Sequence, residues 1–156
     1  MIKFTLICKS NHWPARVKKI TSIIKKILKF KKDLKFSEAI TYNCNIILAD
    51  NKLIKKINYK FRKINQSTDV LTFVSEIRKK NIKKFKICDI FISAEIIKKD
   101  AKRNNTTFYD HFTHILIHSF LHINGFNHIK NEDYYQMNKK ELLILKKLQI
   151  INPAFK

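Results

Sequence analysis

Histidines are concentrated in one short stretch of the chain, and their spacing is that of a metal site. Five of the six histidines and the only glycine lie between residues 107 and 131. His118 and His122 are four residues apart, so a helix places both imidazoles on one face, close enough to bind one metal ion. Gly125 can end that helix because a left-handed conformation costs glycine nothing. The chain can then turn back so that His128 supplies a third nitrogen.

Three neutral imidazoles with an open fourth position form the ligand set of a catalytic zinc site, where the pKa of bound water falls to about 7. We therefore expect His118, His122 and His128 to hold one Zn²⁺ ion. A closed structural site would need a fourth protein ligand, and the three cysteines are distant in sequence and show no CxxC spacing. The alternative is that these are ordinary polar or half-buried histidines on an amphipathic helix.

The segment that contains the three histidines also matches a known signature. His118–His128, HSFLHINGFNH, resembles the HGxLHLxGYDH signature of the YbeY family, bacterial metal-dependent endoribonucleases implicated in ribosomal RNA maturation. The three histidines and the glycine match, whereas Ser119 replaces a glycine and Asn127 replaces an aspartate. The second difference bears on the chemistry, because an amide forms hydrogen bonds but is no base at neutral pH. No glutamate follows the first histidine, so the general base of the HExxH peptidases is missing.

Other segments extend this resemblance. Asn58–Phe73, NYKFRKINQSTDVLTF, is similar to a second family signature in which an arginine precedes a TDVLSF strand. The resemblance implies that Arg62 is functionally essential. A guanidinium fork can hold a phosphate and stabilise the charge that builds during its hydrolysis. The alternative for Arg62 is a surface salt bridge. Ile87–Ser93 resembles the LGDIxIS segment, with Cys88 as a small core residue in place of glycine.

The elements that must position these residues can be predicted from apolar periodicity and capping residues. We predict strands over 2–8, 40–49, 70–74 and 87–93, and helices that begin near Pro14, after Asp50, at Ala94, at Phe108 and after Asn131. The expected architecture is α+β: a mixed sheet of about four strands packed with about five helices, zincin-like, with the metal-binding helix central. The basic connection Ser75–Lys84 is either a flap over RNA or a solvated hairpin loop.

Capping and packing residues can be predicted for the helix over 108–124 and for the last helix. Thr107 is a plausible N-cap with Asp110 three positions later. On the last helix, Met137 with Glu141 resembles the end of the family pattern. Its expected packing face consists of Tyr134, Met137, Leu142, Leu145 and Leu148.

Composition predicts one compact domain over residues 1–156 with a basic surface. The chain has 45% hydrophobic residues, a formal net charge of +21 and a pI near 10.0, which suits RNA as a partner. Lysine supplies most of this charge while glycine is almost absent, so A- and T-rich codon usage is an alternative explanation. The helix near Pro14 has lysines that are either solvated or in contact with RNA: Lys18, Lys19, Lys25, Lys26 and Lys29.

The cellular compartment of the protein can be predicted from its cysteines and its hydropathy. Three well-separated cysteines favour reduced thiols, the first apolar run is too short for a signal peptide, and no stretch reaches the roughly 18 to 20 apolar residues of a membrane span. We expect a cytoplasmic protein that does not contact membranes.

The resemblance implies a single-strand-specific, metal-dependent endoribonuclease that acts in ribosomal RNA maturation (16S rRNA processing) and ribosome quality control. It would hydrolyse phosphodiesters with a zinc-activated water, and its partners would be ribosomal RNA and ribosomal particles. His114, one turn before His118, is either a proton carrier or a structural histidine. The alternatives are a non-catalytic RNA-binding ribosome assembly factor with structural zinc, and a metallohydrolase with a different substrate.

Overall fold

A computed structural model describes residues 1–78, 80 and 83–151 of the chain. Over this described part the chain has four strands and five α-helices, so the predicted α+β class is confirmed. The chain groups into two compact units: the first contains Met1–Val17 and Ser37–Ile96, and the second contains Lys18–Phe36 and the residues from Ile97 onward. The single domain over residues 1–156 stays a prediction. No helix of the described residues is both long and apolar enough to cross a membrane.

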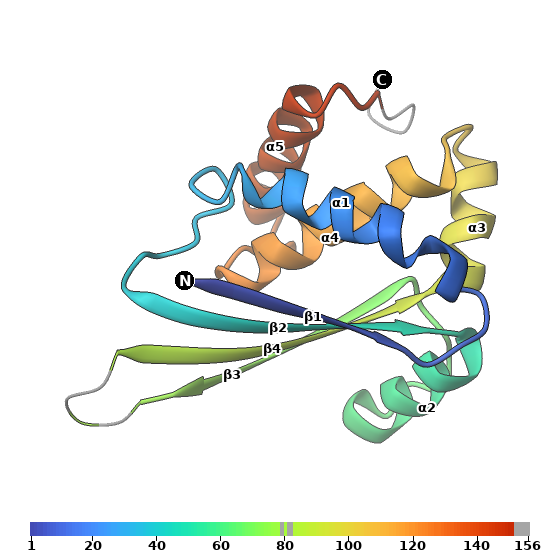
Figure 1. Ribbon diagram of the computed structural model, residues 1–156, viewed down its shortest axis with the longest axis horizontal. Helices are drawn as coiled ribbons and strands as arrows, with labels where there is room; N and C mark the ends of the chain where they lie inside the picture. Colours follow the sequence, from blue (N-terminus) through green and yellow to red (C-terminus); the bar gives the residue numbers. More distant parts are fainter. Residues whose placement is uncertain (79, 81–82, 152–156) are drawn as a thin grey trace. The chain divides into compact units, whose positions relative to one another are not determined.

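The first unit is built on a mixed four-stranded sheet. Its strands are β1 (Ile2–Cys8), β2 (Ile40–Ala49), β3 (Val70–Ile77) and β4 (Lys84–Ser93), in the spatial order β1-β2-β4-β3 (Figure 1). β1, β2 and β4 are parallel, and β3 is antiparallel to β4. β2 and β4 have neighbours on both sides, and they carry the buried residues of the sheet except Leu71 of β3. Cys88 is among them, fully buried as a core residue.

The hairpin of β3 and β4 is longer than predicted. The sequence predicts that β3 ends at Val74 and that β4 begins at Ile87, but the strands continue to Ile77 and back to Lys84. The added residues are mostly polar, and the prediction therefore assigned them to a loop. Main-chain hydrogen bonds between antiparallel strands form whether the side chains are polar or apolar, so the strands extend through them. The predicted basic connection Ser75–Lys84 is therefore partly strand, and a part of it lies outside the described residues.

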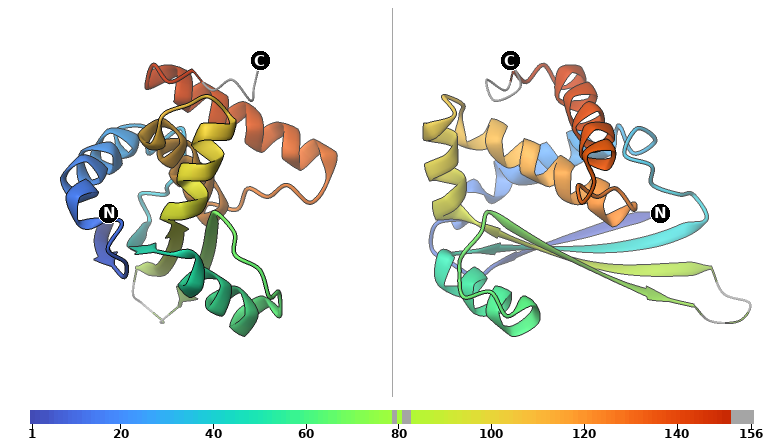
Figure 2. Two further views of the ribbon diagram at one scale, coloured as in Figure 1. Left: turned by 90° about the vertical axis from the view of Figure 1, so that its right-hand side faces the viewer. Right: turned by 180° about the vertical axis from the view of Figure 1, so that it is seen from behind.

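Helix α2 (Asn51–Arg62) follows β2 and packs on the β3 and β4 side of the same unit (Figure 2). Its Ile54 forms a buried cluster with Ala49 and Leu71. Asp50 is the N-cap, as predicted, and its carboxylate accepts a hydrogen bond of 2.8 Å from the Leu53 amide. These contacts hold the first turns of α2 on the sheet.

The second unit is helical. It contains most of α1 (Val17–Leu28) and α3 (Ala94–Arg103), together with α4 (Phe108–Ile123) and α5 (Asn131–Lys147). The short 3₁₀ turn Pro14–Arg16 precedes α1. Ten residues of α4 are buried, and α5 runs beside it (Figure 2). The predicted histidine helix is therefore the core helix of its unit.

The register of α5 differs from the prediction in two respects. Asn131 is the first helical residue rather than the N-cap, which is Lys130. Tyr134 and Leu142 are exposed, whereas the buried face consists of Met137, Glu141, Ile144 and Leu145. These four residues recur at helical spacing, so packing selected the stripe that contains a carboxylate over a more apolar one.

Candidate metal centre

The two ends of α4 determine where its histidines lie. At the start, the Thr107 hydroxyl accepts a hydrogen bond of 3.0 Å from the Asp110 amide, which confirms the predicted cap. At the end, the helix stops at Ile123, one residue earlier than predicted, and Gly125 follows with φ of 92°. This left-handed residue reverses the chain, so that the segment with His128 returns toward the last turns of α4.

The three predicted ligands come together at this end of α4. The Nε2 atoms of His118 and His122 are 3.0 Å apart. The ring centroid of His128 lies 5.4 Å from that of His118 and 5.0 Å from that of His122. One ring nitrogen from each residue lies within 4.8 Å of the other two, so this group could hold a metal ion. Their role as ligands stays a prediction.

Hydrogen bonds select the nitrogen that each ring of α4 presents. His122 Nδ1 is 2.9 Å from the Phe126 carbonyl oxygen, and His118 Nδ1 is 2.5 Å from Glu141 Oε1. A carbonyl and a carboxylate only accept, so both Nδ1 atoms must carry the proton and donate. When both rings are neutral, their Nε2 lone pairs face each other, an arrangement that is repulsive unless a cation binds between them or one ring takes up a proton. The donor set therefore fits a metal ion.

The acid–base state of His122 agrees with this arrangement. Burial, together with positive charge on His118 and His128, lowers the pKa of His122 to about 4, against the opposing effects of the Phe126 hydrogen bond and the Glu141 charge. The His122 ring is therefore neutral at pH 7, and neutral imidazole is the form that binds a metal.

Glu141 of α5 is the residue at this site to which the sequence assigned no role. It is 5% exposed, and its two oxygens lie 2.8 Å from His114 Nε2 and 2.5 Å from His118 Nδ1. Burial alone would raise the pKa of Glu141, but the hydrogen bonds from His114 and His118 outweigh it and bring that pKa down to about 2. The signal in the sequence was a glutamate four residues after Met137, on the face that α5 buries.

These contacts also bear on His114. The sequence left it as either a proton carrier or a structural histidine, and the structure places its Nε2 on the same carboxylate that holds His118. Glu141 thus links both histidines, and the role of His114 stays a prediction.

Asn127, where the family signature has aspartate, has a structural contact of its own. Its Oδ1 accepts a hydrogen bond of 3.2 Å from the Ile129 amide. This bond spans His128 and stabilises the turn that carries it. A carboxylate would accept the same bond, so the substitution preserves this contact.

Arg62 is the last residue of α2 and its side chain is exposed. It forms no ion pair with any residue that the structure describes, so the alternative of a surface salt bridge is not observed. Arg62 belongs to the first unit and the histidines to the second, and its action with them stays a prediction. The loop after it is held by Asp69, whose Oδ1 accepts from the Val70 amide at 2.7 Å and from the Thr68 hydroxyl at 3.1 Å.

The fold and this site define an α+β protein with a three-histidine centre that could hold a metal. Residues 6–149 match the family model described as Endoribonuclease YbeY. The chain belongs to the YbeY family, which confirms the resemblance found in the sequence.

Individual relatives of the chain support its membership of this family. The chain is 39% identical to a Pelagibacter ubique protein named Endoribonuclease YbeY over 148 residues, 94% of this chain and 95% of that one. It is 31% identical to the Bartonella quintana protein of the same name, over 98% of this chain and 97% of the relative. Its structure resembles the solution structure of a Thermotoga maritima protein, with a TM-score of 0.53, 22% identity and coverage of 96% and 92%. That likeness concerns the fold alone.

Proposed function

We propose that this protein is a metal-dependent endoribonuclease that hydrolyses phosphodiester bonds in single-stranded RNA. The observation that carries the proposal is the convergence of His118, His122 and His128, with two Nε2 lone pairs turned toward each other at 3.0 Å. Membership of a family whose relatives are named endoribonucleases supports RNA as the substrate. The net charge of +21 is consistent with a polyanionic substrate.

In this proposal His118, His122 and His128 hold a divalent metal, with zinc as the ion that suits three imidazoles best. When bound, the metal supplies Lewis acidity and activates a water for attack on phosphorus. Glu141 and the Phe126 carbonyl keep the Nδ1 protons on His118 and His122, so that both Nε2 atoms stay available. Arg62 neutralises charge that develops on the phosphate.

The finer assignment is that this activity serves 16S rRNA processing and ribosome quality control in the cytoplasm, with ribosomal particles as partners. It rests on the family resemblance.

The deciding experiment compares cleavage of purified ribosomal RNA by wild-type protein and by a His118→Ala, His122→Ala double variant, with metal content measured on both. We expect the variant to lose both the metal and the cleavage, because two of the three nitrogens are gone. His12→Ala is the matched control, since this exposed histidine belongs to the first unit. Removing and restoring the metal on wild-type protein gives a second test that needs no substitution.

Two outcomes would contradict the proposal. Full cleavage by the metal-free double variant would exclude the histidine centre from the reaction. RNA binding without cleavage, even by the metal-loaded wild-type protein, would favour the RNA-binding assembly factor instead.

A further inference from the structure

A row of lysines follows the exposed side of α1, outside the histidine centre. The α1 lysine strip consists of Lys18, Lys25, Lys26 and Lys29, which line one open groove with Thr21 and Ser22. All four lysines are exposed. Lys18 and Lys25 are seven residues apart on α1, so their side chains lie along one line of the helix, and Lys29 follows four residues later in the turn after its end.

The charge of this strip is not balanced by the protein. The first 32 residues contain no aspartate or glutamate, and none of the four lysines has an ion-pair partner within the described part of the chain. The next acid, Asp33, is held by Lys147 at 2.8 Å. Lys25 lies in the last turn of α1 and Lys29 one residue beyond its end, so these like charges, four residues apart, repel each other. An external anion would relieve this repulsion.

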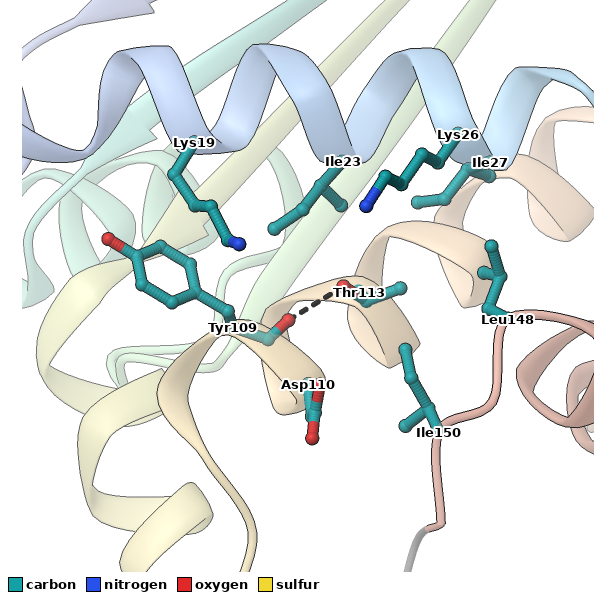
Figure 3. Close-up of a pocket in the computed structure, with 9 residues that line it drawn as sticks. All are labelled: Lys19, Ile23, Lys26, Ile27, Tyr109, Asp110, Thr113, Leu148 and Ile150. Carbon is teal, nitrogen blue, oxygen red and sulfur yellow. Dashed lines mark hydrogen bonds between the residues drawn. The ribbon is translucent and has the colours of Figure 1, made fainter.

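Lys19 does not belong to the strip. Its Nζ lies over the Tyr109 ring, 5.9 Å from the centroid, and it faces a pocket that Asp110 also lines (Figure 3). Lys26 reaches the rim of the same pocket. The pocket holds about 150 Å³, which is below the size of ordinary small-molecule sites, so it does not account for the strip.

The apolar face of α1 distinguishes between two possible anionic partners, a membrane surface and a nucleic acid. A helix that binds a membrane surface inserts an apolar face into it. In α1 that face is already buried within the protein, with Ile20, Ile24 and Ile27 fully inaccessible to solvent. The exposed residues of α1 are lysines and Ser22, whose ammonium and hydroxyl groups can contact the phosphates of a nucleic acid.

We propose that the α1 lysine strip binds the phosphate backbone of an RNA strand and acts as a docking subsite for the substrate, separate from the three-histidine centre. This inference rests on the proposed function for the identity of the partner. Its contacts are electrostatic and independent of base sequence. The strip therefore lowers the KM for long RNA and leaves kcat unchanged.

The test uses the full chain with Lys18, Lys25 and Lys29 each replaced by glutamine, which keeps helix propensity and removes three charges. Binding to single-stranded polyuridylate is measured at several salt concentrations with the metal chelated, so that no cleavage occurs. Each phosphate contact to a single strand contributes about 0.7 to the slope of log K against log salt, so we expect the slope to fall by about 2.

The matched control removes the same charge from another helix of the second unit. It replaces three exposed lysines of α3: Lys98→Gln, Lys99→Gln and Lys102→Gln. We expect this control to keep most of the slope, and the triple arginine variant of the strip to keep all of it. Circular dichroism verifies that each variant is folded.

Three results would overturn the inference: an unchanged slope in the strip variant, an equal loss in the α3 control, or a loss of binding to phosphatidylglycerol vesicles without a loss of RNA binding. An unchanged slope, or a loss of vesicle binding alone, would mean that RNA binds elsewhere on the protein. An equal loss in the α3 control would mean that the slope depends on the net charge of the protein and not on the strip. Because binding is measured without metal, failure here is distinct from failure of the endoribonuclease proposal, which cleavage decides.

Discussion

At the scale of single residues, the site depends on which ring nitrogen each histidine presents. A histidine four residues from another can direct either Nδ1 or Nε2 toward its neighbour. Here the Phe126 carbonyl and the Glu141 carboxylate each accept from an Nδ1–H, which leaves the two Nε2 atoms 3.0 Å apart. The acceptors around the rings therefore matter as much as the histidines themselves.

Glu141→Gln should weaken metal binding. The substituted amide has about the same size but no charge, so it holds His118 and His114 less firmly, and we expect metal affinity to fall by about 10- to 100-fold. Competition with a chelator measures this affinity directly, without reference to activity. Glu132→Gln is the control, because Glu132 is an exposed residue of the same helix. Equal affinity in the two variants would exclude Glu141 from the site.

Arg62→Ala should keep the metal and lose the reaction. If Arg62 neutralises charge on the phosphate, its removal should lower kcat by about 10²- to 10³-fold with unchanged metal content. Lys60→Ala removes an exposed cation from the same last turn of α2 and serves as the control. Wild-type turnover in Arg62→Ala would remove this residue from the mechanism.

At the scale of elements, the critical feature is the turn between α4 and the segment with His128. Gly125 adopts φ of 92°, and a Cβ added there would have no atom within 4 Å. The requirement for glycine is therefore one of backbone conformation and not of space.

Gly125→Ala should destabilise this turn. A left-handed conformation costs alanine about 1 kcal/mol, and the strain is relieved by moving the chain that carries His128. We expect lower stability in urea unfolding together with weaker metal binding. Gly125→Asn should be milder, because asparagine tolerates this conformation better. If alanine and asparagine behaved like glycine in both measurements, the turn would have no such role.

At the scale of the whole molecule, the candidate ligands all lie in the helical second unit, on α4 and on the segment between α4 and α5. A metal that binds only the folded state shifts the unfolding equilibrium of the unit that contains its ligands. Metal binding can therefore be observed as stability, independently of catalysis.

Zinc should raise the unfolding temperature, and chelation should lower it. At a free metal concentration about 100 times Kd, binding adds about 2.7 kcal/mol to the free energy of unfolding. Calorimetry with and without zinc measures the shift, and the His118→Ala, His122→Ala variant should show none. A shift of equal size in that variant would mean that the metal binds elsewhere.

The sequence by itself determined most of the local structure and the family. Helical spacing, the Thr107 cap and Gly125 predicted α4 to within one residue, because caps and turns depend on neighbours in the chain. The three histidines and the TDVLTF segment identified the family. The strands β1 and β2 were also predicted with their observed bounds.

Tertiary structure decided what depends on partners distant in sequence. The extra length of β3 and β4 comes from pairing between two strands, which the composition of either one does not reveal. The buried face of α5 was set by packing, and that register brings Glu141 to His114 and His118, 27 and 23 residues away. Spacing along one helix predicts which rings are neighbours, but the nitrogen that each ring presents is chosen by hydrogen-bond acceptors that only the folded chain supplies.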